Sequence, residues 1–169
     1  MFLRRFGWYR KLDNFFQRGK KGYCNEDLWD IYHWFTSLFP IMLEDFMKKT
    51  NGYPCPFPPP SDTKDIDAWY KEQERKWKYE VNKLIWFLKE ANDFTCSQKN
   101  EIDFNVNFDF VKTDFNDIWS ELKLTYPTEE DEQKSKKHFE RSKEIADYKK
   151  ECFNKALRQF EKISRNLWD

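Results

Sequence analysis

The spacing of apolar residues along the chain predicts four helices, near 5–18, 26–49, 66–92 and 129–168. In the second of these, apolar residues follow one another at steps of three or four, the repeat of a single helix face: Leu28, Ile31, Phe35, Leu38, Met42 and Phe46. Pro40 falls inside this segment and should kink or split the helix, because proline lacks a backbone N–H group. The expected fold is mainly α, a helical bundle with a long C-terminal helix.

One segment departs from the helical repeat. Residues 102–110 alternate strictly between apolar and polar positions, which is typical of a half-buried strand. No second segment of equal quality is visible to pair with it, and residues 114–123 have the spacing of a short helix. A strand without a partner in its own chain would pair with another chain, pair with itself across a two-fold axis, or lie as an extended arm over helices.

The last predicted helix bears on assembly. No Gly or Pro interrupts residues 129–168, and a helix of this length would extend about 60 Å at 1.5 Å per residue. That is longer than a compact domain of this size, so the helix must break, project from the domain, or pack against another chain. The long helix and the unpaired strand together allow a homo-oligomer.

Proline and charge subdivide what we expect to be a single helical domain, 1–169. Residues 51–62 hold five of the seven prolines and predict an extended connector. Charge lies in blocks although its sum is zero: 1–21 has seven basic residues and one acid, whereas 93–132 has eleven acids and three lysines. Within the second block, residues 93–127 form an acidic insertion. A net charge of zero gives no bulk polycation argument for nucleic acid.

The first predicted helix is amphipathic and basic. Trp8, Leu12, Phe15 and Phe16 share one face, and the arginines and lysines lie largely elsewhere. A basic amphipathic helix can lie on a membrane surface, but docking onto its own domain is the commoner arrangement. We therefore expect an internal contact and no membrane partner.

The residues that carry most enzyme chemistry are sparse. The four glycines stand at positions that allow no phosphate-binding loop and no nucleophile elbow. The four cysteines are widely spaced, with no C-x-x-C pair for zinc or redox chemistry, and are expected to be free thiols. Asp30 and His33 share a helix face, but a carboxylate-bridged metal site would need a second such pair. The sequence therefore predicts no catalytic residue, no metal, no cofactor and no enzyme activity.

Aromatic residues indicate binding instead. They make up 20% of the chain, and eight tryptophans exceed what one small core needs. On a helix starting at Glu26 the apolar stripe takes the core, so Trp29 is either buried against the N-terminal or C-terminal helix or exposed beside acids. If these side chains are exposed, Asp27, Asp30 and Trp34 form an acidic-aromatic patch that would bind a basic groove of a partner. Trp29 is a further candidate binding residue. Reversing both charges should then abolish binding and leave the melting temperature nearly unchanged.

The acidic block is the next candidate surface. Asp103 and Asp109 lie on the polar side of the strand predicted at 102–110, and both are candidate binding residues. If this strand is a contact between copies, Phe108→Lys should weaken self-association, because it places a charge on the apolar side.

A set of short motifs also runs along the chain. They are a tryptophan among basic residues near the start, R-G-K-K-G-Y, the GY-x3-DLWD signature at 22–30, a proline in mid-helix, G-Y-P, a tryptophan-bearing helix near 69–87, and a terminal helix closing on N-L-W-D. Together they resemble a group of small proteins encoded by bacteriophages and prophages of gut Firmicutes. The resemblance covers about two thirds of the chain, and residues 94–127 form an insertion outside it.

This resemblance implies an accessory protein that acts in the cytoplasm of the bacterial host without enzyme activity. Small phage proteins with acidic patches often inhibit host defence, and anti-CRISPR proteins are among them. The resemblance thus implies a protein that binds and inhibits a host defence effector, such as a CRISPR nuclease, by protein–protein contact.

Two other functions stay open on the sequence. Residues 134–169 form a second basic block, with eleven basic residues and six acids. Trp and Tyr could stack on bases while the basic blocks at 1–21 and 134–169 hold phosphate, as in a nucleotide- or nucleic-acid-binding protein or sponge. Alternatively, the long helix and the strand could build an oligomer, as in a phage structural or assembly protein. Nucleic-acid affinity should fall steeply with salt, whereas an assembly protein should form a stable homo-oligomer without a host factor.

Overall fold

The computed structural model describes residues 2–50, 53–54, 58–112 and 120–167. In chain order its elements are α1 (Phe2–Lys21), the 3-10 helix η1 (Asn25–Leu28), α2 (Ile31–Lys49), α3 (Ile66–Ala91), β1 (Asn107–Lys112), β2 (Ser120–Thr125), α4 (Glu129–Ile163) and the 3-10 helix η2 (Ser164–Asn166). The mainly α fold with a long C-terminal helix, expected from the sequence, is confirmed.

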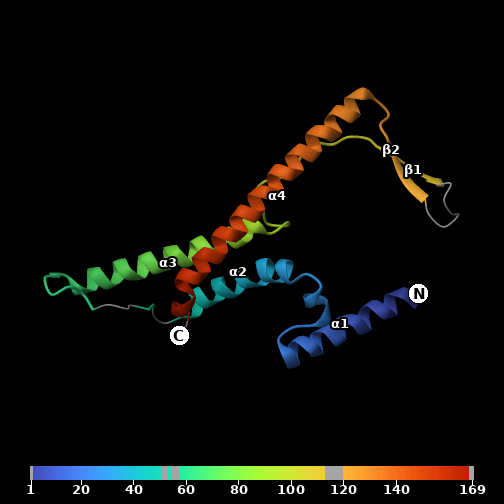
Figure 1. Cartoon of the computed structure of the whole chain (residues 1–169). Helices are drawn as coiled ribbons and strands as arrows, with labels where there is room; N and C mark the ends of the chain where they lie inside the picture. Colours follow the sequence, from blue (N-terminus) through green and yellow to red (C-terminus); the bar gives the residue numbers. More distant parts are fainter. Residues whose placement is uncertain (1, 51–52, 55–57, 113–119, 168–169) are drawn as a thin grey trace.

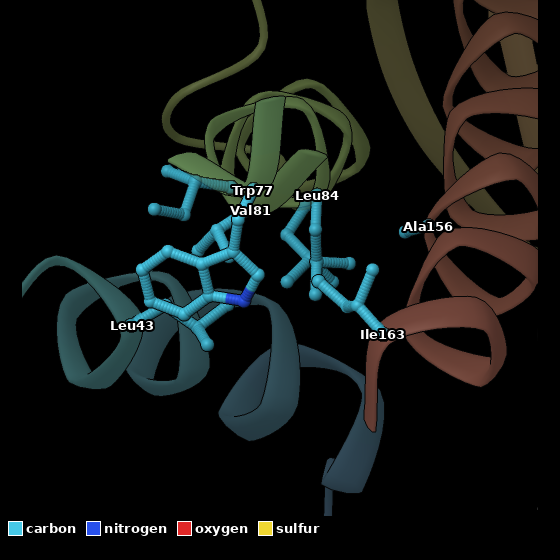
Figure 2. Close-up of a cluster of buried hydrophobic side chains, with 8 residues drawn as sticks. Leu43, Trp77, Val81, Leu84, Ala156 and Ile163 are labelled. Atoms are coloured by element: carbon cyan, nitrogen blue, oxygen red, sulfur yellow. The ribbon is translucent and has the colours of Figure 1, made fainter. Parts of the chain in front are cut away.

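The hydrophobic core lies where α2, α3 and α4 meet (Figure 2). Its buried side chains come from α2 (Leu43), from one face of α3 (Trp77, Val81, Leu84, Ile85, Leu88) and from α4 (Ala156, Ile163). Asp65 fixes the start of α3, because its carboxylate accepts a hydrogen bond from the backbone N–H of Ala68 at 2.9 Å. Each fully buried aliphatic side chain contributes about 2 kcal/mol, so this contact among three helices holds the body of the protein together.

The second helix begins later than the sequence predicted. Instead of one helix from residue 26, η1 ends at Leu28 and α2 starts at Ile31, with Asp30 as its N-cap. This break shifts the helical register, so four of the six residues that were expected in the core are exposed: Leu28, Ile31, Leu38 and Met42. Pro40 lies inside α2 without ending it and is itself buried.

Strand β1 has a partner in its own chain. It pairs antiparallel with β2, so the expectation that no segment could pair with it is wrong. The short helix expected over 114–123 is also wrong for residues 120–123, which belong to β2, while 114–119 lie outside the described residues. The signal was present in S-E-L-K-L-T, where Leu122 and Leu124 alternate with charged residues. The helical spacing of the aromatic residues just before this segment masked it.

The residues before β1 lie as an extended arm along α4, which is one of the arrangements expected for this segment. The ring Nδ1 of His138 donates to the carbonyl oxygen of Ile102 at 2.8 Å, and the backbone N–H of Asn105 donates to the carboxylate of Asp131 at 3.0 Å. The strand itself therefore begins later than the predicted 102–110.

Two helices extend away from the three-helix body (Figure 1). α4 has 35 residues and so measures about 52 Å. Its C-terminal half packs on α3, and its N-terminal half projects with the β1–β2 hairpin at its end. α1 stands apart and joins the body through η1. Within the described ranges, no helix combines the length and the hydropathy that a bilayer span requires.

Candidate protein-binding site at the α1–α2 junction

A cleft opens where η1 connects α1 to α2. It has a volume of about 540 Å³ and is lined by Arg18, Gly22, Glu26, Asp27, Asp30, His33, Trp34, Ser37 and Leu38. Three of the binding residues expected from the sequence, Asp27, Asp30 and Trp34, therefore lie on one surface. Gly22 makes the turn out of α1 with a φ of 80°, a left-handed conformation that favours glycine.

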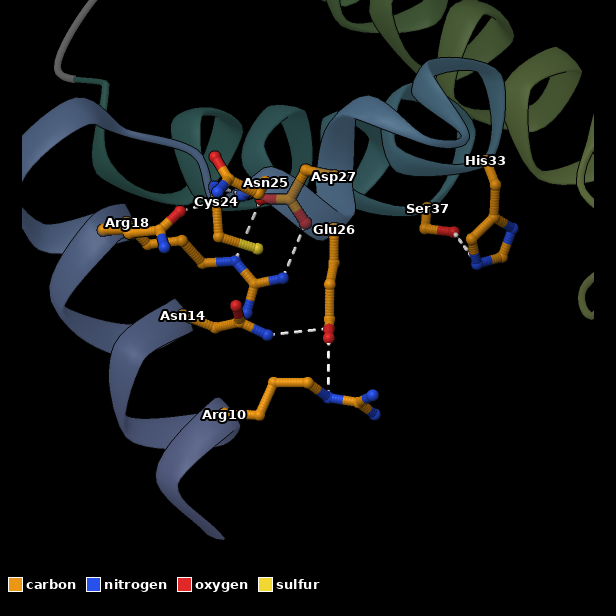
Figure 3. Close-up of polar contacts among 10 residues, drawn as sticks. Arg10, Asn14, Arg18, Cys24, Asn25, Glu26, Asp27, His33 and Ser37 are labelled. Atoms are coloured by element: carbon orange, nitrogen blue, oxygen red, sulfur yellow. Dashed lines mark hydrogen bonds and ion pairs between the residues drawn. The ribbon is translucent and has the colours of Figure 1, made fainter. Parts of the chain in front are cut away.

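Asp27 is a structural residue of this cleft rather than a free charge. Its carboxylate accepts hydrogen bonds from Arg18 Nη2 at 2.6 Å, from Arg18 Nε at 3.1 Å and from the backbone N–H of Cys24 at 2.8 Å (Figure 3). Its side chain is only 9% exposed. The hydrogen bonds from Arg18, with that from Cys24, hold the pKa of Asp27 well below its usual range. The expected double charge reversal rested on Asp27 being an exposed charge, and that premise is wrong. Reversing the charge of Asp27 would break this clamp, so we now expect it to lower the melting temperature.

α1 docks through its polar face. Glu26 of η1 accepts hydrogen bonds from Asn14 Nδ2 at 2.7 Å and from Arg10 Nε at 2.8 Å (Figure 3). Together with Arg18, these contacts place one polar stripe of α1 against η1. Docking of the helix onto its own domain is thus observed, but the apolar Phe15 and Phe16 are left exposed.

Asp30 keeps an open side chain at the start of α2. Its carboxylate accepts the backbone N–H of His33 at 2.8 Å, which caps the helix, and no described cation forms an ion pair with it. The ring of His33 lies edge-on to Phe94, with 5.3 Å between ring centroids. Over the described part of the chain, no group of three or more His, Cys, Asp or Glu side chains could hold a metal ion. Glu26, Asp27 and Arg18, which also line the cleft, all form ion pairs. Asp30 is therefore the carboxylate of this surface that has no ion-pair partner among the described residues.

Trp29 is the most open large side chain of the junction. It is 90% exposed at the turn between η1 and α2, so the interpretation that buried it against a terminal helix is wrong, and the interpretation with Trp29 beside acids is the one observed. Leu28 and Ile31 are exposed on either side of it, whereas Trp34 is half-buried in the cleft wall. Leu28, Trp29 and Ile31 flank the break between η1 and α2, which leaves them outside the core.

The two acidic candidates of the insertion lie elsewhere. Asp103 is on the extended arm along α4, where its carboxylate accepts the backbone N–H of Phe104 at 3.0 Å. Asp109 is exposed on β1, opposite Lys123. Neither lines the cleft at the α1–α2 junction, so the six expected residues divide between two separate parts of the molecule.

A second hollow lies on α3. It has a volume of about 380 Å³ and is lined by Tyr79, Asn82, Lys83, Trp86 and Phe87. Trp86 is 51% exposed there, against 90% for Trp29. Trp29 is therefore the ring with more surface to offer a partner, and Trp86 provides a matched comparison.

Asp27→Ala is expected to release α1 from η1. Amide hydrogens of residues 9–21 should exchange about tenfold faster, because hydrogen bonds to a charged group contribute roughly 1–2 kcal/mol. Hydrogen–deuterium exchange followed by mass spectrometry measures this. The control is Asp13→Ala, since the carboxylate of Asp13 bonds to Gln17 on the same helix at 2.6 Å. Equal exchange in the two variants would contradict the clamp.

The junction thus presents an open indole, apolar neighbours and one free carboxylate on a frame fixed by Arg10 and Arg18. An exposed indole with apolar neighbours and a carboxylate at its side suits contact with another surface. The function has to be inferred from these residues, because no family model, curated protein or solved structure matches the chain.

Proposed function

We propose that the protein is a non-enzymatic binding module that engages another protein through Trp29 and its neighbours. The observation that carries this proposal is the 90% exposure of the Trp29 side chain. Burying a tryptophan at an interface contributes more than burying most other residues, and such residues dominate binding energies. Leu28 and Ile31, exposed beside it, enlarge the apolar surface to be covered.

The frame behind Trp29 favours binding. η1 is held by ion pairs from α1, with Arg10 on Glu26 at 2.8 Å and Arg18 on Asp27 at 2.6 Å. Asp30 caps α2 on the other side of the indole. A residue presented by a fixed turn loses little conformational freedom on binding, so less of the contact energy is spent on ordering.

The chemistry of this surface defines the kind of partner. An apolar pocket in the partner would take the indole, and a lysine or arginine at its edge would meet the free carboxylate of Asp30. The apolar contact supplies most of the affinity, whereas the charge at the rim directs orientation and association rate. The partner surface is therefore an apolar groove with a basic edge.

The partner we propose is a host defence effector, which makes the protein an inhibitor of the kind that phage accessory proteins provide. The resemblance of the GY-x3-DLWD signature at 22–30 to such proteins supports this, and Trp29 stands inside that signature. A CRISPR nuclease of the bacterial host is the effector to test first. Inhibition would be steric, since bound protein would cover a surface that the effector needs.

Trp29→Ala is expected to weaken binding at least thirtyfold, because truncating a central aromatic anchor typically costs about 2 kcal/mol or more. The measurement is inhibition of target cleavage by the purified nuclease, together with the Kd from interferometry. Trp86→Ala is the matched control and should bind like the unchanged protein. Both variants should keep their melting temperature, since both rings are largely exposed.

The charge is tested separately with Asp30→Asn. Asparagine is as good an N-cap as aspartate, so α2 keeps its start while the carboxylate is lost. Binding should weaken moderately, about threefold to tenfold, and the loss should shrink at high salt. Full inhibition by Trp29→Ala would refute the proposed surface, and loss with Trp86→Ala instead would move the contact to α3.

A further inference from the structure

The β1–β2 hairpin carries an apolar face that nothing in the described chain covers. Phe108 stands opposite Leu124 in the register, and Leu122 is two residues from Leu124, so the three side chains share one face. Phe108 is 59% exposed, Leu124 45% and Leu122 48%. A hairpin of two strands is only marginally stable in water without packing on a further element. We therefore expect another element to pack on its apolar face.

α1 offers a surface of matching kind. Because its polar face is taken by η1, Phe15 and Phe16 are exposed on the part of the helix that points away. The two rings meet edge to face with centroids 5.8 Å apart, which makes one continuous aromatic surface. A helix with one apolar stripe packed on one face of a hairpin is a common way to close a small layered structure.

The charges of the two surfaces are complementary. The described side chains of residues 9–21 include five basic groups and one acid, and Arg10 and Arg18 are already paired with η1. On and beside the hairpin, the described side chains of residues 101–109 and 122–125 include three acids and one lysine. Opposite charges around two apolar faces raise the association rate and fix orientation.

Within one chain the two surfaces stand apart. The ion pairs to η1 fix α1 near the N-terminal end of α2. The hairpin lies at the N-terminal end of α4, which projects from the three-helix body (Figure 1). We propose that α1 of one copy covers the apolar face of the β1–β2 hairpin of a second copy. Because the two contact surfaces differ, two reciprocal contacts close a dimer, and a single contact per pair extends a chain of copies.

Light scattering coupled to size exclusion tests the contact at tens of micromolar protein. The unchanged protein should show a mass above the 21.0 kDa of one chain, and the association should weaken as salt rises. The hairpin variant Phe108→Ser with Leu124→Ser should run as a monomer. The α1 variant Phe15→Ser with Phe16→Ser should do the same. A monomeric mass for the unchanged protein would overturn the proposal.

A mixing experiment identifies the two surfaces. The hairpin variant still has an intact α1, and the α1 variant still has an intact hairpin, so an equimolar mixture of the two monomers should form a mixed complex. A contact of α1 with α1, or of hairpin with hairpin, could not join one variant to the other. Absence of the mixed complex would therefore overturn the pairing even if each variant alone is monomeric.

Controls separate this contact from folding and from the proposed function. Circular dichroism should show unchanged helix content in both double variants, because all four substituted side chains are exposed. Tyr79→Ser, an exposed aromatic residue on α3, should leave the mass of the assembly unchanged. Trp29→Ala should also leave it unchanged, since Trp29 belongs to neither surface. Loss of self-association in either of these two variants would count against α1 and the hairpin as the contact.

Discussion

Leu84→Ala is expected to lower the free energy of unfolding by about 3 kcal/mol, the middle of the range for removing a buried leucine side chain. Leu84 is 0% exposed and belongs to the cluster formed by α2, α3 and α4 (Figure 2). The loss has two parts. The removed methyl groups no longer gain free energy by leaving water, and the surrounding helices do not close the cavity that remains. Urea unfolding followed by circular dichroism measures the change.

The control for this change is Leu157→Ala on α4. Leu157 is 43% exposed, so its truncation should alter the free energy of unfolding by less than about 1 kcal/mol. The denaturant dependence should be the same for both variants and the unchanged protein, because the same surface is exposed on unfolding. Similar losses for Leu84 and Leu157 would show that the three-helix cluster is not the centre of stability.

The sequence predicted the helical body well because its helices bury one stripe each. The helix predicted near 66–92 is α3, and its buried stripe consists of Trp77, Val81, Leu84, Ile85 and Leu88. The start of the last helix at residue 129 was also found, since Thr128 caps it through the backbone N–H of Asp131 at 3.1 Å. Local rules of spacing and capping fix such elements without knowledge of the rest of the chain.

The rules of apolar spacing did not predict which face of α1 is buried, because that depends on the element against which the helix packs. The apolar residues Phe15 and Phe16 indicated which face of α1 should be buried, yet the polar face docks because Glu26 and Asp27 lie on η1. The choice depends on the turn at Gly22, which brings Arg18 to Asp27 across nine residues. No periodicity within α1 contains that information.

The candidate site was predicted in part for the same reason. A 3.6-residue repeat places Asp27, Asp30 and Trp34 near one another, and all three line the cleft. Their roles differ, because Asp27 is clamped by Arg18 whereas Asp30 is open. The exposure of Trp29 follows from a break between η1 and α2 that the smooth apolar stripe in the sequence concealed. The existence of the main helices was therefore predictable, whereas β2 and the orientation of individual charges were not.

The buried carboxylate of Glu90 is the second place where a single change should have a large effect. Glu90 lies near the end of α3 and is 6% exposed. Its Oε2 accepts hydrogen bonds from the hydroxyl of Ser97 at 2.7 Å and from the hydroxyl of Tyr148 at 2.9 Å. The backbone N–H of Ser97 donates to the same carboxylate oxygen at 3.2 Å. One side chain thus ties α3, the turn after it and α4 together.

The charge of Glu90 determines the pH dependence of this tie. Burial by itself would raise the pKa of Glu90, but the hydrogen bonds from Ser97 and Tyr148 outweigh it and lower the pKa below the usual value for glutamate. A carboxyl whose pKa is lower in the folded chain binds protons more weakly there than when unfolded. Its contribution to stability is therefore complete above the ordinary glutamate pKa and is lost as the pH falls through the lowered pKa.

Glu90→Gln is accordingly expected to lower the free energy of unfolding by about 2 kcal/mol at neutral pH. Hydrogen bonds from Ser97 and Tyr148 to a neutral amide oxygen are weaker than those to a carboxylate, and the new amide NH2 faces the backbone N–H of Ser97. Urea unfolding at neutral pH and at about pH 3 measures this, and the difference between the two proteins should shrink at the acid end, where Glu90 approaches protonation. Glu151→Gln, an exposed carboxyl paired with Lys155 at 2.6 Å, should change stability little at either pH. A Glu90→Gln loss that stays the same at both pH values would show that shape, and not the charge of Glu90, holds α3 to α4.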